Sequence, residues 1–408
     1  MQSIHRILIQ ILPKICLKHK WQANFLLELF SIVYCAQGKL NFINMSRYSE
    51  LNELTFRRNF SMYVDWVALN LAIIEFNEAE LQPKATIIGA VDCSFISKSG
   101  SSTFGKDNFW SGVESRNKKG LEVSLLSLID TSNGQAWSLD ITQTPANLSS
   151  KEGSLDEYTR MDFYAEQVSD LLPQLGHVKY LVADGYYAKK KFIHCLTKMD
   201  KHLITKLRPD ANLRYLLNEK GQAHGNKKYD GKVNWKNIQL DKWVDVGRDE
   251  KYPHLHIYTQ VLNSPYFKRN FRVVMLYHTK TKKYVVLTST DINLSARQIV
   301  FFYQLRFQIE FLFRDAKQLM GLNHCQARDQ HKLDFHFNMS MTALNLARCW
   351  QKQEKAVQSI QSLRREAYNI KFTQLLLGKL KQNAELNLVL DINLPDIQEV
   401  IQLGNMNT

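Results

Sequence analysis

Residues 299–317, IVFFYQLRFQIEFLFRDAK, combine an apolar helix with polar residues at regular spacing. Tyr303, Arg306, Glu310 and Lys317 follow one another at intervals of three, four and seven positions. At about 100° per residue, these intervals place all four on one helix face. Most other residues in the stretch are apolar, which predicts a helix that is buried apart from its polar stripe. An internal ion pair between Arg306 and Glu310 would be the ordinary structural explanation for two of the four.

Two aspartates upstream favour a functional explanation. Asp92 follows the apolar run IIGAV at residues 87–91, and Asp184 follows VKYLVA at residues 178–183. We expect each aspartate to end a strand at the carboxyl edge of a sheet, where α/β proteins place their ligands. Either one alone would be explained as a helix cap or a turn residue. Two of them favour one shared cleft.

The pattern Tyr303-x2-Arg306-x3-Glu310-x6-Lys317, with the two aspartates before it, resembles bacterial insertion-sequence transposases of the DDE class. Those enzymes carry a Tyr-Arg-Glu-Lys signature, and the resemblance covers roughly residues 85–350. It implies an α/β fold whose mixed-sheet core is similar to ribonuclease H and retroviral integrases.

The resemblance also implies the chemistry of the site. Asp92, Asp184 and Glu310 would be the catalytic residues and the ligands of two Mg²⁺ ions, for which Mn²⁺ can substitute. Carboxylate oxygens suit such hard cations. Two ions about 3.5–4 Å apart can activate a nucleophile and stabilise the leaving oxygen. Tyr303, Arg306 and Lys317 would bind the DNA strand.

The charge of the chain agrees with a double-stranded DNA partner. It has 408 residues, 53 Lys and Arg against 39 Asp and Glu, and a formal charge of +14. Residues 185–290 hold 22 basic and 8 acidic residues, which accounts for the whole excess. A basic stretch of this kind attracts a polyanion, although a lysine-rich solvated surface would look the same.

The same basic stretch separates Asp184 from Glu310 and predicts an insertion in the core. We expect a helical N-terminal domain (1–80), a first core part (81–207), an antiparallel β insertion (208–290), a second core part (291–352) and a helical C-terminal segment (353–408). The expected helix 186–199 and strand 202–207 precede the insertion. Its expected strands are 232–240, 243–246, 254–263, 271–278 and 283–289.

The resemblance also bears on the tryptophans of the insertion. Family members that open DNA ends through a hairpin have a β insertion here, with a tryptophan that stacks on a flipped base. We expect Trp235 and Trp243 to pack in the core instead.

The two ends of the chain are predicted to be helical. Residues 39–45 and 49–60 could form a helix-turn-helix pair exposing Arg47, Arg57 and Arg58, suited to a transposon end. A helical bundle without DNA contacts fits equally well. In the tail, the apolar runs 375–377 and 386–390 fit either a dimer contact or a cap on the core.

Several classes of protein are not expected. No run of 18 uncharged apolar residues is present, so no membrane partner is expected. The six cysteines lack the spacing of zinc ligands, so no zinc site is expected. No phosphate-binding loop appears, so no nucleotide cofactor is expected. We therefore expect a cytoplasmic protein that associates with the nucleoid when it binds DNA.

The predicted function is that of an insertion-sequence transposase. It would cut element ends and join the 3′-hydroxyl to target DNA, by cut-and-paste through a hairpin and as a homodimer bridging both ends. Two alternatives remain: a structure-selective nuclease on the same core, and a DNA-binding relative without catalysis.

Overall fold

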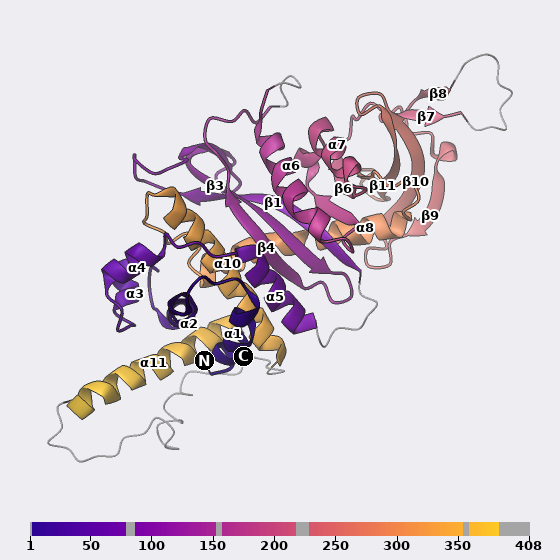
Figure 1. Ribbon diagram of the computed structural model, residues 1–408. Coiled ribbons are helices and arrows are strands. Elements are labelled where there is room, and N and C mark those ends of the chain that lie inside the picture. The colour runs from indigo at the N-terminus through magenta and orange to yellow at the C-terminus, as the bar shows by residue number, and fades with distance from the viewer. Residues whose placement is uncertain (1, 79–85, 152–156, 218–227, 354–358, 383–408) are drawn as a thin grey trace.

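The computed structural model describes residues 2–78, 86–151, 157–217, 228–353 and 359–382. Its centre is one twelve-stranded sheet, with helices on both faces and at both ends of the chain (Figure 1). The predicted mixed α/β class with helical ends is confirmed. Most neighbouring strands are antiparallel, and the parallel pairs are β1 with β5 and β5 with β6. The strands are β1 (Ile87–Ser97), β2 (Asp107–Ser111), β3 (Arg116–Asp130), β4 (Ala136–Gln143), β5 (Tyr180–Ala183), β6 (His202–Leu207), β7 (Arg214–Leu216), β8 (Tyr229–Lys232), β9 (Val244–Arg248), β10 (Leu255–Ser264), β11 (Arg269–His278) and β12 (Tyr284–Ser289).

Helices cover the two faces of this sheet unequally. α6 and α7 pack on one face, against β3 and β6, whereas α5, α8, α9 and α10 pack on the other. α11 lies against α2. The helices are α1 (Gln2–Ile11), α2 (Lys20–Cys35), α3 (Phe42–Ser46), α4 (Glu53–Asn59), α5 (Trp66–Glu78), α6 (Arg160–Leu171), α7 (Lys190–Lys198), α8 (Ala296–Leu305), α9 (Phe307–Leu319), α10 (Gln330–Gln353) and α11 (Ile360–Gln382), with short 3₁₀ turns η1 (Leu12–Lys14), η2 (Leu172–Gln174), η3 (Gly185–Tyr187) and η4 (Leu240–Lys242). Among the described residues, none of these helices is long and apolar enough to cross a bilayer.

β1 is longer than its apolar run predicted. Asp92 does not end the strand, because β1 continues to Ser97 beside the fifteen-residue β3, and the pairing runs from Ile87–Asp130 to Ser97–Gly120. At the last pair, a Cβ on Gly120 would lie 2.4 Å from the Phe95 ring, so this position needs glycine. The expectation that Asp92 ends a strand is therefore wrong, and its functional place depends on β5 instead.

The insertion continues the core sheet. β12 returns antiparallel beside β6, and β11, β10, β7 and β8 follow outward, with β9 also paired to β10. The expected strand 232–240 is wrong beyond its first residue, since this stretch is a loop ending in η4. β7 was not predicted. A three-residue strand has too few residues for a visible alternation of apolar and polar side chains.

Both tryptophans of the insertion pack inside it. Trp243 is buried, and its indole N–H donates to the Tyr215 hydroxyl at 3.2 Å. Trp235 stacks on Tyr284, and its indole N–H donates to the Ala211 carbonyl at 2.7 Å. These contacts agree with a core role, because each ring has a packing partner and each N–H has an acceptor.

The helical ends match part of their description. α3 and α4 form a helix pair within 39–60, and Arg47, Arg57 and Arg58 are exposed on it. Residues 375–377 belong to α11, where Leu375 and Leu376 are exposed. The run 386–390 lies outside the described residues.

Candidate active site

Two consecutive helices carry the polar stripe. α8 ends at Leu305 and α9 begins at Phe307, while Arg306 between them keeps helical dihedrals (φ −51°, ψ −35°). The expected burial of the apolar residues is partly wrong, because Phe301, Phe307 and Phe311 are 43%, 47% and 40% exposed. These helices pack on only one face of the sheet, so their outer side meets solvent.

Arg306 lies between two of the predicted acids. Its side chain is buried, and its Nη2 donates to Glu310 Oε1 at 2.7 Å. Its Nη1 stands 3.6 Å from Asp92 Oδ2. The ordinary i,i+4 ion pair between Arg306 and Glu310 is thus present, and the Arg306 side chain also approaches Asp92 on β1. The guanidinium links the signature helix to the aspartate of the central strand.

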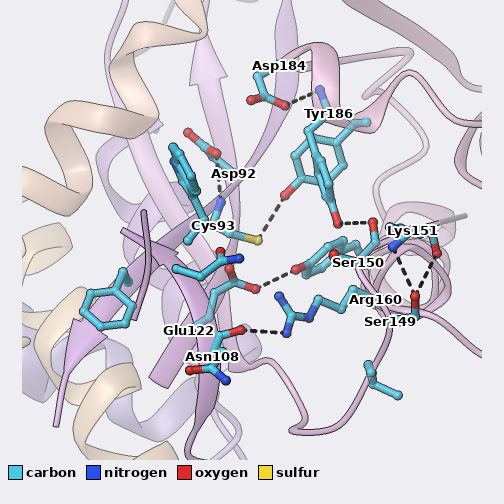
Figure 2. Close-up of a pocket in the computed structure, with 16 residues that line it drawn as sticks. Asp92, Cys93, Asn108, Glu122, Ser149, Ser150, Lys151, Arg160, Asp184 and Tyr186 are labelled. Carbon is cyan, nitrogen blue, oxygen red and sulfur yellow. Dashed lines mark hydrogen bonds between the residues drawn. The ribbon is translucent and has the colours of Figure 1, made fainter. Parts of the chain in front are cut away.

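Strand register brings Asp92 and Asp184 together. Val91 pairs with Ala183 in the parallel ladder of β1 and β5, so the next residue on each strand is an aspartate. β5 ends there, and Asp184 caps η3, accepting the Tyr186 amide at 2.8 Å. Asp92 Oδ1 accepts a hydrogen bond from the backbone amide of the next residue, Cys93, at 2.8 Å. Figure 2 shows the two aspartates entering one pocket from these neighbouring segments.

Close packing holds the Asp184 turn in place. Thr205 Oγ1 on β6 donates to the Asp184 carbonyl at 2.7 Å. A Cβ on Gly185 would lie 3.0 Å from the Lys206 carbonyl oxygen, so a larger residue would push the turn away from β6. The backbone that presents the carboxylate is therefore fixed by the neighbouring strand.

The two aspartates share an unfavourable electrostatic environment. Burial, and then the charge of Asp184, raise the pKa of Asp92 to about 7. Burial also raises the pKa of Asp184. The charge of Glu310 acts in the same direction on both. Arg306 opposes this effect without outweighing it, so the charged forms of the two aspartates are disfavoured, first by burial and then by neighbouring negative charge.

The remaining two stripe residues lie on either side of this group. Lys317 Nζ donates to Ser94 Oγ at 2.7 Å and to the Phe95 carbonyl at 3.0 Å, which ties α9 to β1. Burial lowers the pKa of Lys317. The Tyr303 ring lies 5.7 Å from the Arg306 guanidinium carbon. The structure thus brings Tyr303, Arg306 and Glu310 close to Asp92, while Lys317 contacts β1 further along the strand, at Ser94 and Phe95.

A divalent cation fits this chemistry in part. Asp92 and Asp184 offer hard oxygen donors that repel each other, and a cation would relieve that repulsion. Glu310, however, directs Oε1 to Arg306. In the described part of the chain, no three Asp, Glu, His or Cys side chains already stand in metal-binding geometry. Glu310 would have to leave Arg306 to complete a three-carboxylate site.

Comparison with known families agrees with this arrangement. A family model described as the transposase DDE domain matches residues 83–346, more than half of the chain. The chain belongs to the DDE-domain transposase family. A search of curated proteins finds no match. The matched range includes β1, β5 and α9, and therefore every residue of the predicted site.

One buried acid near the site was missed. Glu122 on β3 lines the pocket of about 760 Å³ that Asp92 and Asp184 enter, and it accepts the Tyr164 hydroxyl at 2.6 Å. Burial raises the pKa of Glu122. A signal was available, because Glu122 interrupts an apolar run between Leu121 and Val123. On the same pocket wall, Trp110 of β2 is 57% exposed.

Proposed function

We propose that this DDE-domain transposase serves an insertion sequence, cutting the ends of its element and joining the freed 3′-hydroxyl to target DNA. The observation that best supports this proposal is that three acids, Asp92, Asp184 and Glu310, lie near one buried arginine at one place on the sheet. The strand order β4-β3-β1-β5-β6 supports a ribonuclease-H-like core, because three antiparallel strands precede two parallel ones.

Each residue has a proposed role in that reaction. Asp92 and Asp184 would hold Mg²⁺, with Glu310 joining them after its carboxylate turns away from Arg306. Bound there, a pair of such ions supplies activation of water or of the 3′-hydroxyl and stabilises the leaving oxygen. Arg306, released from Glu310, can donate both guanidinium edges to phosphate oxygens beside the cut. Lys317 holds α9 against β1, which keeps Glu310 opposite Asp92.

Further details of the proposal come from the family resemblance. They include a hairpin intermediate, supported by the β insertion between β6 and β12, and a homodimer that bridges both ends. Tyr303 would pack against the bound strand beside Arg306.

A strand-transfer assay tests the proposal. The full chain is incubated with Mg²⁺, a supercoiled target plasmid and duplexes carrying the DNA that flanks this coding region, pre-cut in one set of reactions and uncut in another. Joined product in the wild type, and its absence in Asp92→Asn, is the expected result. Cleavage without joining would instead support a nuclease, and binding without either would support a relative that lacks catalysis.

A further inference from the structure

A second pocket lies beyond the far end of β1. It encloses about 350 Å³, and its basic lining residues are Lys39, Lys98 and Arg328. None of the described residues that line it is acidic. The ion pairs among the described residues do not include any of these three cations. We call this cavity the Lys98 pocket.

Its walls are fixed before any ligand binds. Lys106 Nζ donates to the carbonyls of Ser99 and Gly100, at 3.1 and 3.0 Å. The Phe104 amide donates to the Arg328 carbonyl at 2.9 Å, which joins the two loops that form the pocket. Lys98 itself donates to the Cys325 carbonyl. The cations are therefore presented by a rigid frame, which lowers the entropic cost of binding.

The N-terminal helices are attached at the same point. Lys39 precedes α3, and the neighbouring Leu40 amide donates to His324 Nδ1 at 3.3 Å. Burial lowers the pKa of His324, in keeping with a neutral ring that accepts this bond. The Lys98 pocket thus joins the α3–α4 pair to the core.

The pocket lies on the Asp92 side of β1. Alternate residues of a strand point to the same face, so Asp92 and Ser94 share a face, and Lys98 continues it just beyond the strand end. The contact of Lys317 with Ser94 confirms that this is the face covered by α9. Six residues at about 3.3 Å each separate Lys98 from Asp92 by roughly 20 Å.

We propose that the Lys98 pocket binds a backbone phosphate of the DNA duplex whose scissile phosphate lies at Asp92. Three cations in a pocket whose described lining contains no acidic residue suit an anion, and a phosphate oxygen accepts from both guanidinium and ammonium groups. Successive phosphates of one strand advance about 3.4 Å along the duplex axis, so roughly 20 Å corresponds to about six steps from the cut. The contact would set the register of the duplex without reading its sequence. This inference rests on the proposed function for the position of the cut.

Salt dependence of binding tests the pocket. The double variant Lys39→Gln/Arg328→Gln leaves Lys98 in place, because its ammonium supports the Cys325 loop. For a short mixed-sequence duplex, loss of one phosphate contact should reduce the slope of log K against log[salt] by about 0.9. Lys14→Gln/Lys20→Gln removes the same charge from exposed positions outside the pocket and should keep the wild-type slope. An unchanged slope in the pocket variant, or an equal loss in the control, would overturn the inference.

A second measurement locates the phosphate. In duplexes from the element end, one neutral methylphosphonate at a time replaces a phosphate. A substitution about six steps from the cut should weaken wild-type binding but not binding by the pocket variant. If no position behaves in this way, the pocket does not hold DNA. If inorganic phosphate stabilises only the wild type while duplex binding is equal in both proteins, the pocket takes the free ion and the proposal fails.

Catalysis separates this inference from the proposed function. At low salt and saturating DNA, the control variant Lys14→Gln/Lys20→Gln should cleave at the wild-type rate and position, whereas the pocket variant should cut at less uniform positions, because the contact that sets the register is lost. Uniform cutting by the pocket variant together with an unchanged salt slope would reject the pocket alone. A wild type that binds with the predicted slope but never cleaves would reject the proposed function alone.

Discussion

Two aspartates stand at or just beyond strand ends on opposite edges of the sheet, and their surroundings differ. Asp184 follows β5 and faces Asp92. Asp291 lies just beyond β12, which runs antiparallel to β6 and so ends at the other edge. The sequence places both in the same way, at the end of an apolar strand. Their neighbours decide which one can act.

Asp291 is neutralised by its own neighbours. It accepts the Tyr180 hydroxyl at 2.9 Å, and Lys179 lies 3.5 Å away. Burial alone would raise the pKa of Asp291, but the Asn293 amide and the Tyr180 hydroxyl outweigh it, and the pKa is lowered. At the other edge, the pKa values of Asp92 and Asp184 are raised. A buried acid whose negative charge has too few compensating partners, so that its pKa is raised, indicates a functional site better than an acid whose charge is compensated.

The largest expected effect separates the two edges by catalysis. Asp92→Asn, Asp184→Asn or Glu310→Gln should each lower cleavage at least about a thousandfold, because a lost metal ligand removes several kcal/mol of transition-state stabilisation. Duplex affinity should stay within a few-fold of the wild type. Asp291→Asn is the matched control and should cleave nearly normally. Equal losses at both edges, in single-turnover assays, would remove the distinction.

Stability against pH gives the next effect. The unfolded Asp92 releases its proton near pH 4, whereas the folded one holds it to about pH 7. The contribution of Asp92 to the free energy of unfolding is therefore greatest below pH 4. It decreases by up to about 4 kcal/mol as the pH rises to 7. Urea unfolding of the wild type should show this decline, and Asp92→Asn should show a smaller one, because burial also raises the pKa of Asp184 and of Glu122. For Asp291 the sign is reversed, so its contribution is lost as pH falls below its unfolded pKa.

Added Mg²⁺ should act on one edge alone. At pH 8, above the pKa of about 7 for Asp92, a bound cation should relieve the repulsion between the two aspartates and stabilise the wild type. The expected gain is about 3 kcal/mol at a hundred times the dissociation constant. Thermal unfolding with and without MgCl₂ measures it. Asp291→Asn should keep the gain, while Asp92→Asn should lose most of it. A wild type indifferent to Mg²⁺ would contradict the proposed ligand set.

The smallest effect lies at the compensated edge. Lys179 is 55% exposed, and such surface pairs contribute about 0–1 kcal/mol. Lys179→Gln should therefore change the free energy of unfolding by less than about 1 kcal/mol, because Tyr180 and the Asn293 amide still hold Asp291. Tyr180→Phe, which removes the half-buried hydroxyl that donates to Asp291, should cost more. Denaturant titration of the two variants decides the order.

Local spacing was enough to place Arg306 and Glu310 on one helix face, because helix periodicity is a short-range property. Arg306 and Glu310 interact as their separation of four requires. Asp184 was placed correctly as well, since β5 is short and ends in a capped turn. These predictions needed no knowledge of distant partners.

The errors came from partners far away in the sequence. Asp92 lies within a strand because β3 is long enough to extend β1 past the apolar run. Phe307 and Phe311 are exposed because only one side of α9 meets the sheet. The Lys98 pocket joins three separate segments, at residues 39, 97–103 and 323–328, so no local pattern could indicate it. Tertiary pairing decided each of these cases.

The pairing of β6 with β12 has a consequence for protein engineering. Leu207 and Val286 face each other across the ladder, so the polypeptide leaves the core and returns to it at adjacent points. Both junctions of the segment between them therefore lie at one strand pair, which makes residues 208–285 a candidate for exchange between homologous proteins. A replacement would also have to supply the contacts that β10 and β11 make with α8, the helix that carries Tyr303.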